Sequence, residues 1–112
     1  MDSQYEDLLA FQLAQSNIKF ERQYKFCPNR KWRADFYIRP MILAEVQGLV
    51  NLNVGMSRHT TIKGYTLDCE RNNEAQLLGY MLLQFTQQQV KNGLALETIK
   101  RAIEIRMINL TD

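Results

Sequence analysis

Two adjoining apolar runs constrain the fold of this chain more than any other feature of its sequence. The runs are residues 32–38 (WRADFYI) and residues 41–47 (MILAEVQ), and Arg39-Pro40 connects them. Both runs are typical of β-strands. A short connection that contains proline favours an antiparallel arrangement. The sequence therefore predicts two antiparallel neighbours in a sheet.

Strand side chains alternate between the two faces of a sheet, so each run can be divided into two sets. In the first run, one face is expected to hold Arg33, Asp35 and Tyr37, and the opposite face Trp32, Ala34, Phe36 and Ile38. In the second run, the corresponding sets are Leu43, Glu45 and Gln47 on one face and Ile42, Ala44 and Val46 on the other. The antiparallel pairing then brings Asp35 close to Glu45.

Two carboxylates inside an apolar sheet are unfavourable unless something compensates their charge. A divalent metal ion is the usual compensation, and Asp35 with Glu45 would provide hard oxygen ligands that suit magnesium or manganese. One histidine and two cysteines in the whole chain are too few for a zinc site. The alternative is that each carboxylate forms a salt bridge, with Arg33 or Lys63, in a sheet without chemical activity.

The overall composition agrees with a single domain over residues 1–112, because the fractions of apolar residues (46%) and charged residues (23%) are ordinary for a globular protein. No apolar stretch approaches the roughly 20 residues that span a bilayer. The N-terminus is acidic where a signal peptide would be basic, which predicts a cytoplasmic protein with reduced Cys27 and Cys69.

Basic residues are unevenly distributed, although the net charge is only +2. They gather at Lys19, Arg22, Lys25, Arg30, Lys31 and Arg33, and again at Arg58, His59 and Lys63. Basic segments beside a carboxylate cluster suit a phosphodiester substrate, and guanidinium groups grip phosphate oxygens well. Ordinary solvated surfaces are the other interpretation of this pattern.

The remaining elements follow from periodicity and capping signals. We expect a helix over Gln4–Gln15, with a Ser3–Glu6 capping box, and a strand over 18–26 before the two central strands. A long loop (48–63), a helix over 65–78 that Gly79 ends, a strand over 80–85, a capped turn and a helix over 94–109 complete the chain. The predicted fold is α/β: a mixed four-stranded sheet flanked by helices in the order α-β-β-β-α-β-α. Its last strand is parallel to residues 41–47.

Several segments resemble one family of enzymes. They are RKWRADF (30–36), AEVQG (44–48), GMSRHT (55–60), KG (63–64), DCERN (68–72) and LGYMLLQF (78–85). Together they resemble the PD-(D/E)XK nuclease superfamily, and within it the small phage and bacterial endonuclease-like proteins related to the very short patch repair endonuclease. The resemblance implies a restriction-endonuclease-like core and a nuclease that works in the cytoplasm of a bacterial or phage-infected cell.

The resemblance also implies roles for individual residues. Asp35 and Glu45 match the two acidic residues that bind magnesium, for which manganese can substitute. The main-chain carbonyl of Val46 and an acidic residue of the first helix, best matched by Glu6, are expected as further ligands. Glu6 has an alternative role in the capping box. Gln47 stands where the superfamily usually has lysine, and glutamine can orient water but supplies no positive charge.

Three residues of the predicted loop complete this assignment. His59 resembles a loop histidine near the scissile phosphate and could act as a general acid or base, or it could be an ordinary surface histidine. Lys63 or Arg58 could supply the missing positive charge. Asp68 could hydrogen-bond His59 or add to the site, or it could be a solvated helix carboxylate. One of Asn72 and Asn73 is expected to make a specific polar contact, structural or catalytic.

The function implied is that of a magnesium-dependent endodeoxyribonuclease, with structure-specific, repair or recombination roles open and RNA open as a substrate. Cutting both strands would favour a homodimer. The alternatives are a catalytically impaired relative that binds DNA, and a protein-interaction module on the same fold. No membrane association is expected.

Overall fold

The structure is a computed structural model that describes residues 4–48 and 62–111. Its elements, in chain order, are α1 (Gln4–Gln15), β1 (Glu21–Lys25), β2 (Arg33–Ile38), β3 (Ile42–Val46), α2 (Ile62–Leu77), β4 (Met81–Phe85), α3 (Gln87–Lys91) and α4 (Leu94–Thr111). The four strands form one sheet in the order β1-β2-β3-β4. The predicted α/β class, with a mixed four-stranded sheet flanked by helices, is confirmed.

The strand pairing places the two candidate carboxylates near the middle of the sheet. β1 and β2 are antiparallel, as are β2 and β3, which confirms the predicted three-stranded meander. β3 and β4 are parallel, also as predicted, and Glu45 is paired with Gln84 of β4. The first four side chains of β3 are buried, and Glu45 is one of them, so this carboxylate lies inside the domain.

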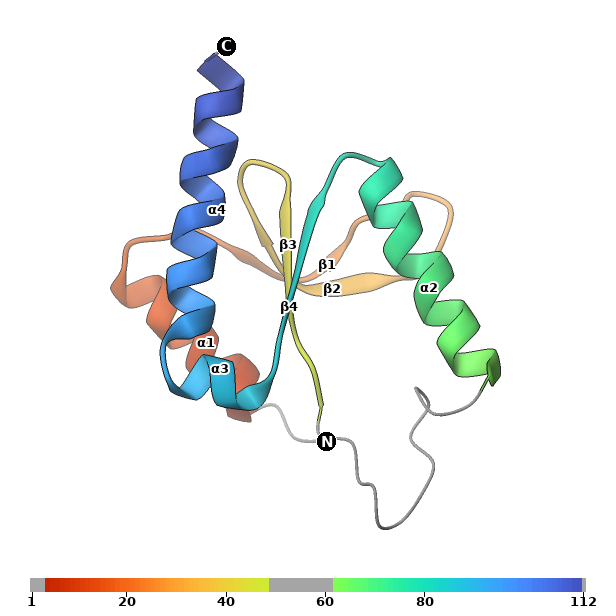
Figure 1. Ribbon diagram of the computed structural model, residues 1–112, viewed down its shortest axis with the longest axis horizontal. Coiled ribbons are helices and arrows are strands. Elements are labelled where there is room, and N and C mark those ends of the chain that lie inside the picture. Colours follow the sequence, from red (N-terminus) through yellow and green to blue (C-terminus); the bar gives the residue numbers. More distant parts are fainter. Residues whose placement is uncertain (1–3, 49–61, 112) are drawn as a thin grey trace.

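Helices cover the two faces of the sheet unequally, as Figure 1 shows: α1, α3 and α4 lie on one side, and α2 lies on the other. The first buried cluster, under α1, α3 and α4, comprises Leu9, Leu13, Phe36, Ile38, Ile42, Ala44, Phe85, Val90, Ala95, Ile99 and Ala102. The second comprises Phe26, Cys27, Ala34, Leu43 and Ala75. The larger core fixes the sheet, and the smaller core under α2 leaves room for a polar site.

The helix ends follow local signals in the sequence. Glu6 and Asp7 lie in the first turn of α1, where acidic side chains complement the helix dipole. Gly79 ends α2 with a φ of 95°, a left-handed conformation that favours glycine, and so confirms the predicted cap. Thr86 and Gln89 form the predicted capping box of α3. Ser3, the predicted cap of α1, lies outside the described residues.

The predicted alternation of side chains is wrong at the start of β2. Phe36 and Ile38 pack in the first cluster, whereas Trp32 and Ala34 pack in the second cluster with Tyr37. In β3 the prediction holds, because Leu43 packs in the second cluster whereas its neighbours in the strand pack in the first.

A distortion of β1 accompanies this change of side. Gln23 has a φ of 50° and lies between the two β1 residues that pair with Phe36 and Ala34. A left-handed residue interrupts regular alternation in a strand pair. This interruption lies beside Asp35. The sequence around Gln23 contains no turn signal that would have predicted it.

The second helix begins earlier than the sequence predicted. α2 starts at Ile62 rather than near residue 65, so Lys63 belongs to its first turn and not to a loop. The Thr66 hydroxyl donates to the Ile62 carbonyl at 2.7 Å, as in a regular helical turn. Gly64, which follows Lys63, is buried within the helix. Among the described helices, none is long and apolar enough to cross a membrane.

Candidate functional site

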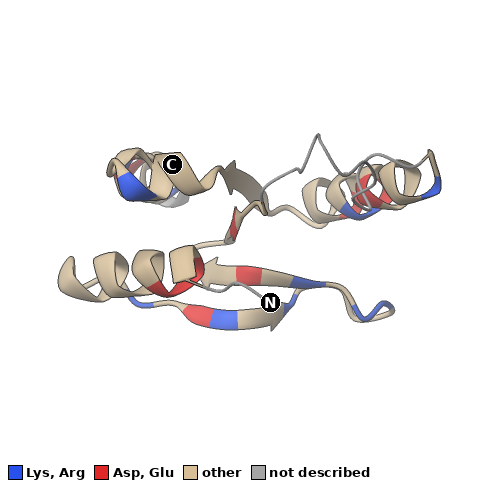
Figure 2. Cartoon of the chain, turned by 90° about the horizontal axis from the view of Figure 1, so that it is seen from below, with Lys and Arg blue, Asp and Glu red and all other residues tan. Residues whose placement is uncertain are grey.

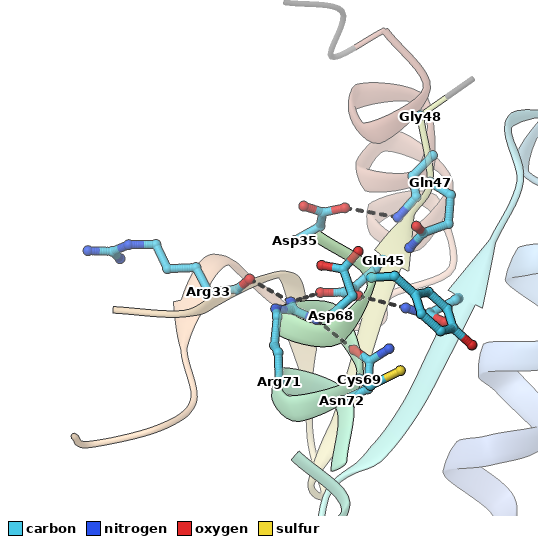
Figure 3. A pocket seen from close by; sticks show the side chains of 12 residues that line it. Arg33, Asp35, Glu45, Gln47, Gly48, Asp68, Cys69, Arg71 and Asn72 are labelled. Atoms are coloured by element: carbon cyan, nitrogen blue, oxygen red, sulfur yellow. Dashed lines mark hydrogen bonds and ion pairs between the residues drawn. The ribbon is translucent and has the colours of Figure 1, made fainter. Parts of the chain in front are cut away.

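A cavity of about 790 Å³ lies where α2 passes the strands β2, β3 and β4. Its lining residues are Arg33, Asp35, Glu45, Val46, Gln47, Gly48, Tyr65, Asp68, Cys69, Arg71, Asn72 and Gln84. Figure 3 shows Asp35 and Glu45 together in this cavity, with α2 side chains facing them. The predicted convergence of the two carboxylates is therefore present in the fold.

Asp35 is half-buried and is held by the main chain of the next strand. The Val46 N–H donates to its Oδ2 at 2.9 Å. Burial raises the pKa of Asp35 to about 6, against the lowering effect of the Val46 hydrogen bond. The negative charges of Glu6 and Glu45 raise this pKa further, and Arg71 lowers it. Asp35 is thus a carboxylate whose negative charge is incompletely compensated.

The raised pKa predicts how stability depends on pH when divalent metals are removed with EDTA. The folded protein holds the Asp35 proton to about pH 6, whereas the unfolded chain releases it near the ordinary pKa of about 4. Between these values the folded state binds more protons, so the contribution of Asp35 to stability is lost as pH rises through the window. The Asp35→Asn variant should show a shallower fall in unfolding free energy from about pH 4 to about pH 6. Denaturant titrations at several pH values measure this, and identical pH profiles for the two proteins would contradict it.

Glu45 is more deeply buried, with 6% of its surface exposed. Two side chains donate hydrogen bonds to its carboxylate, and one of them is charged. The Arg71 guanidinium donates to both carboxylate oxygens, at 3.2 Å to Oε1 and in a shorter contact to Oε2. Gln84 Nε2 donates to Oε1 at 3.3 Å. Glu45 therefore forms a buried ion pair, whereas Asp35 receives a main-chain hydrogen bond.

Arg71 is a site residue that sequence reasoning missed. Besides Glu45, it donates to the main-chain carbonyl of Arg33 at 2.8 Å and to Asn72 Oδ1 at 3.0 Å. Its guanidinium also lies 5.3 Å from the centre of the Phe26 ring. The polar contact expected of an asparagine in this segment is thus present at Asn72.

A signal for Arg71 was available in the spacing of α2. Tyr65 lies four residues before Cys69 and Asp68 four residues before Asn72, so these side chains lie on one side of a helix. All four line the cavity, together with Arg71. A polar stripe that faces a sheet rather than solvent marks a site, but the sequence alone did not tell which side of α2 is covered.

Gln47 and Arg33 both line the cavity, but their side chains are placed differently. Gln47 lines it and is anchored by its main-chain N–H, which donates to the Phe85 carbonyl at 2.7 Å. The guanidinium of Arg33 points away from Asp35 and Glu45 (Figure 3) and donates to the Gln23 carbonyl at 3.1 Å. The sequence allowed a salt bridge between a site carboxylate and Arg33. In the structure, Glu45 pairs with Arg71 instead.

Two other predicted site residues, Glu6 and Lys63, do not line the cavity. Glu6 is not among the cavity residues and accepts hydrogen bonds from Arg22 at 2.9 Å and Gln23 at 3.1 Å. Lys63 is exposed in the first turn of α2 and does not line the cavity. Arg58 and His59 lie outside the described residues. Their roles stay predictions.

The turn between β1 and β2 carries the basic residues Arg30 and Lys31, and Figure 2 shows positive charge along this turn and at the start of β2. The Arg30 guanidinium stacks 3.8 Å from the centre of the Trp32 ring and pairs with Glu70 at 2.7 Å. Arg30 is therefore held in place by an aromatic ring and by α2, while Lys31 is exposed.

The cavity holds two carboxylates that are candidate donors to a hard cation. Within residues 4–48 and 62–111, no three Asp, Glu, His or Cys side chains form a group that could hold a metal ion. Asp35 and Glu45 nevertheless both present oxygen atoms to the cavity, and oxygen is the ligand that magnesium prefers. Besides burial, the negative charges of Glu6 and Glu45 raise the pKa of Asp35. A bound cation would offset these negative charges.

Comparison with known proteins identifies the fold. No protein-family model and no curated protein matches the sequence. The structure is similar to the "Homing Endonuclease I-Bth0305I Catalytic Domain", with a TM-score of 0.62 over 92% of each chain and a sequence identity of 16%. The chain therefore has the fold of a nuclease catalytic domain.

Proposed function

We propose that this protein is a metal-dependent endonuclease of the PD-(D/E)XK type that hydrolyses phosphodiester bonds in DNA. The observation that carries the proposal is the pair of carboxylates, Asp35 on β2 and Glu45 on β3, in one cavity of a nuclease-like fold. The structural neighbour is described as a homing endonuclease catalytic domain, and such a name supports a nucleic-acid substrate for a chain of this fold.

Asp35 and Glu45 would hold magnesium or manganese, with the main-chain carbonyl of Val46 as a further ligand and Glu6 as the candidate from α1. When bound, such an ion activates water and stabilises the negative charge that develops on the phosphate. The protein contributes the placement of the two carboxylates. The Val46 N–H fixes one oxygen of Asp35, and Gln84 fixes one oxygen of Glu45.

Other residues are candidates for orienting the attacking water and for transferring protons. Gln47 lies in the cavity, so its amide could orient the attacking water, as lysine does at this position in the superfamily. His59 is the candidate for proton transfer, and Lys63 or Arg58 the candidate for added positive charge. These three assignments rest on the sequence resemblance.

The basic turn before β2 supports a substrate with a phosphate backbone. Arg30, Lys31 and Arg33 follow one another closely on the strand and turn that lead to Asp35. Stacking on Trp32 reduces the side-chain freedom that Arg30 would lose on binding a phosphate. We propose that this turn contacts the backbone on one side of the scissile bond.

Incubation with supercoiled plasmid, linear duplex, branched DNA, single strands and RNA tests the function. We expect conversion of at least one DNA substrate in magnesium or manganese, and no conversion in EDTA. Cleavage that persists in EDTA would contradict a metal-dependent mechanism. Cleavage of RNA alone would contradict the DNA assignment.

A second candidate is a catalytically impaired relative that binds DNA. The Arg71–Glu45 ion pair favours it, because Glu45 is already neutralised in this structure, and Gln47 carries no charge. This candidate predicts DNA binding without cleavage of any of these substrates in either metal.

A further inference from the structure

Arg71 makes more contacts than a helix residue needs to hold α2 on the sheet. Its guanidinium donates to both oxygens of Glu45, to the Arg33 carbonyl and to Asn72. The Arg71 side chain is 15% exposed and that of Glu45 is 8% exposed. The Glu45 carboxylate is therefore occupied by a buried, bidentate cation, at the position where the proposed function requires a metal ligand.

We propose that Arg71 and the divalent cation exchange on Glu45, and that the released guanidinium binds the phosphate of the substrate. The inference rests on the proposed function and deepens it. It assigns to Arg71 the positive charge that Gln47 does not supply.

The charge on Glu45 supports the exchange. In this structure Arg71 neutralises Glu45, and a divalent cation on that carboxylate would leave the guanidinium without its partner. The phosphodiester anion of the substrate would then be its complementary partner.

The chemistry of the groups also supports it. The planar fork of arginine matches the two oxygens of a carboxylate and those of a phosphate equally well. Gln84 donates to Glu45 from the neighbouring strand, so this carboxylate keeps one hydrogen bond when Arg71 leaves. Figure 3 shows Arg71 at the cavity that Asp35 and Glu45 also line, so its guanidinium lies next to the space where a phosphate would bind in this proposal.

A purely structural role is the competing explanation. Arg71 lies over Phe26 and bonds the Arg33 carbonyl, so it also attaches α2 to β2. A structural guanidinium on Glu45 would also compete with a cation, but it would not then bind the phosphate of the substrate. Metal affinity tests the competition, and the gain in DNA affinity on adding a divalent cation separates the two explanations.

The test is calorimetric titration of Mn²⁺ into the full chain without DNA, comparing wild type with Arg71→Gln. Removal of the competing guanidinium should tighten Mn²⁺ binding about tenfold, equivalent to about 1.4 kcal/mol. Arg71→Lys, whose ammonium cannot form the bidentate pair, should lie between the two proteins. Arg101→Gln, which removes an exposed charge from α4, should leave the affinity unchanged.

A second titration follows the released guanidinium. Ca²⁺ should strengthen binding of a short DNA duplex to wild type. The factor by which Ca²⁺ raises DNA affinity should be about tenfold smaller in Arg71→Gln than in wild type. Equal or weaker Mn²⁺ binding by Arg71→Gln would overturn the exchange. If that variant does not fold, unchanged Mn²⁺ affinity of Arg71→Lys would overturn it.

The two proposals fail differently. A wild type that cuts DNA and binds Mn²⁺, with an Arg71→Gln variant of the same affinity, disproves the exchange alone. A wild type that neither binds Mn²⁺ nor cuts DNA disproves the proposed function, and the exchange with it.

Discussion

Replacement of Asp35 by asparagine should lower magnesium-dependent DNA cleavage by at least about 10³-fold, or about 4 kcal/mol of transition-state stabilisation. Asparagine has nearly the same shape as aspartate, and its side-chain oxygen can still accept the Val46 hydrogen bond. It lacks the negative charge that a metal ligand requires at this position. The loss should appear in kcat, because the cation acts on charge that develops during the reaction.

Asp7→Asn is the matched control for this prediction. It makes the same chemical change on α1, at a side chain that is 60% exposed and pairs with Arg22. Exposed ion pairs contribute about 0–1 kcal/mol, so this variant should remain stable and active. Single-turnover cleavage of one DNA substrate by the three proteins gives the comparison. Equal rates for Asp35→Asn and wild type would remove Asp35 from the catalytic site.

The second large effect concerns stability. Arg71→Ala should lower the free energy of unfolding by about 3–5 kcal/mol, because it leaves a buried carboxylate without its cation. Glu45 would retain the Gln84 hydrogen bond, which does not compensate its charge. Chemical denaturation in EDTA measures the effect without any contribution from bound metal.

Arg30→Ala provides the comparison for Arg71. Arg30 also pairs with a glutamate and stacks on an aromatic ring, but both partners of its ion pair are about half exposed, at 44% and 49%. Its removal should change stability by about 1 kcal/mol or less. If both arginine variants unfold at the same denaturant concentration, Arg71 does not have the energetic role assigned to it.

Much of the fold was legible in the sequence because each element carries its own local signal. Alternating runs predicted the strand pair that holds Asp35 and Glu45, and Gly79 predicted the end of α2. The order of elements then required β4 to be parallel to β3. These features depend on short-range patterns, which a single sequence displays directly.

The features that were wrong or missed depend on contacts between distant segments. Trp32 and Ala34 change sides where β1 is distorted at Gln23, a residue without a turn signature. α2 begins at Ile62 and buries Gly64, although glycine is a poor helix former. Arg71 joins the site because α2 turns its polar stripe toward the sheet, and periodicity alone does not give the orientation of a helix.

The central claim is that Asp35 and Glu45 hold a divalent cation at the catalytic centre. Its most direct test is an anomalous difference map from crystals grown with Mn²⁺. We expect a peak between the two carboxylates, with the Arg71 guanidinium displaced from Glu45. A protein that crystallises with Mn²⁺ but shows no peak there, and keeps the Arg71–Glu45 pair intact, would contradict it.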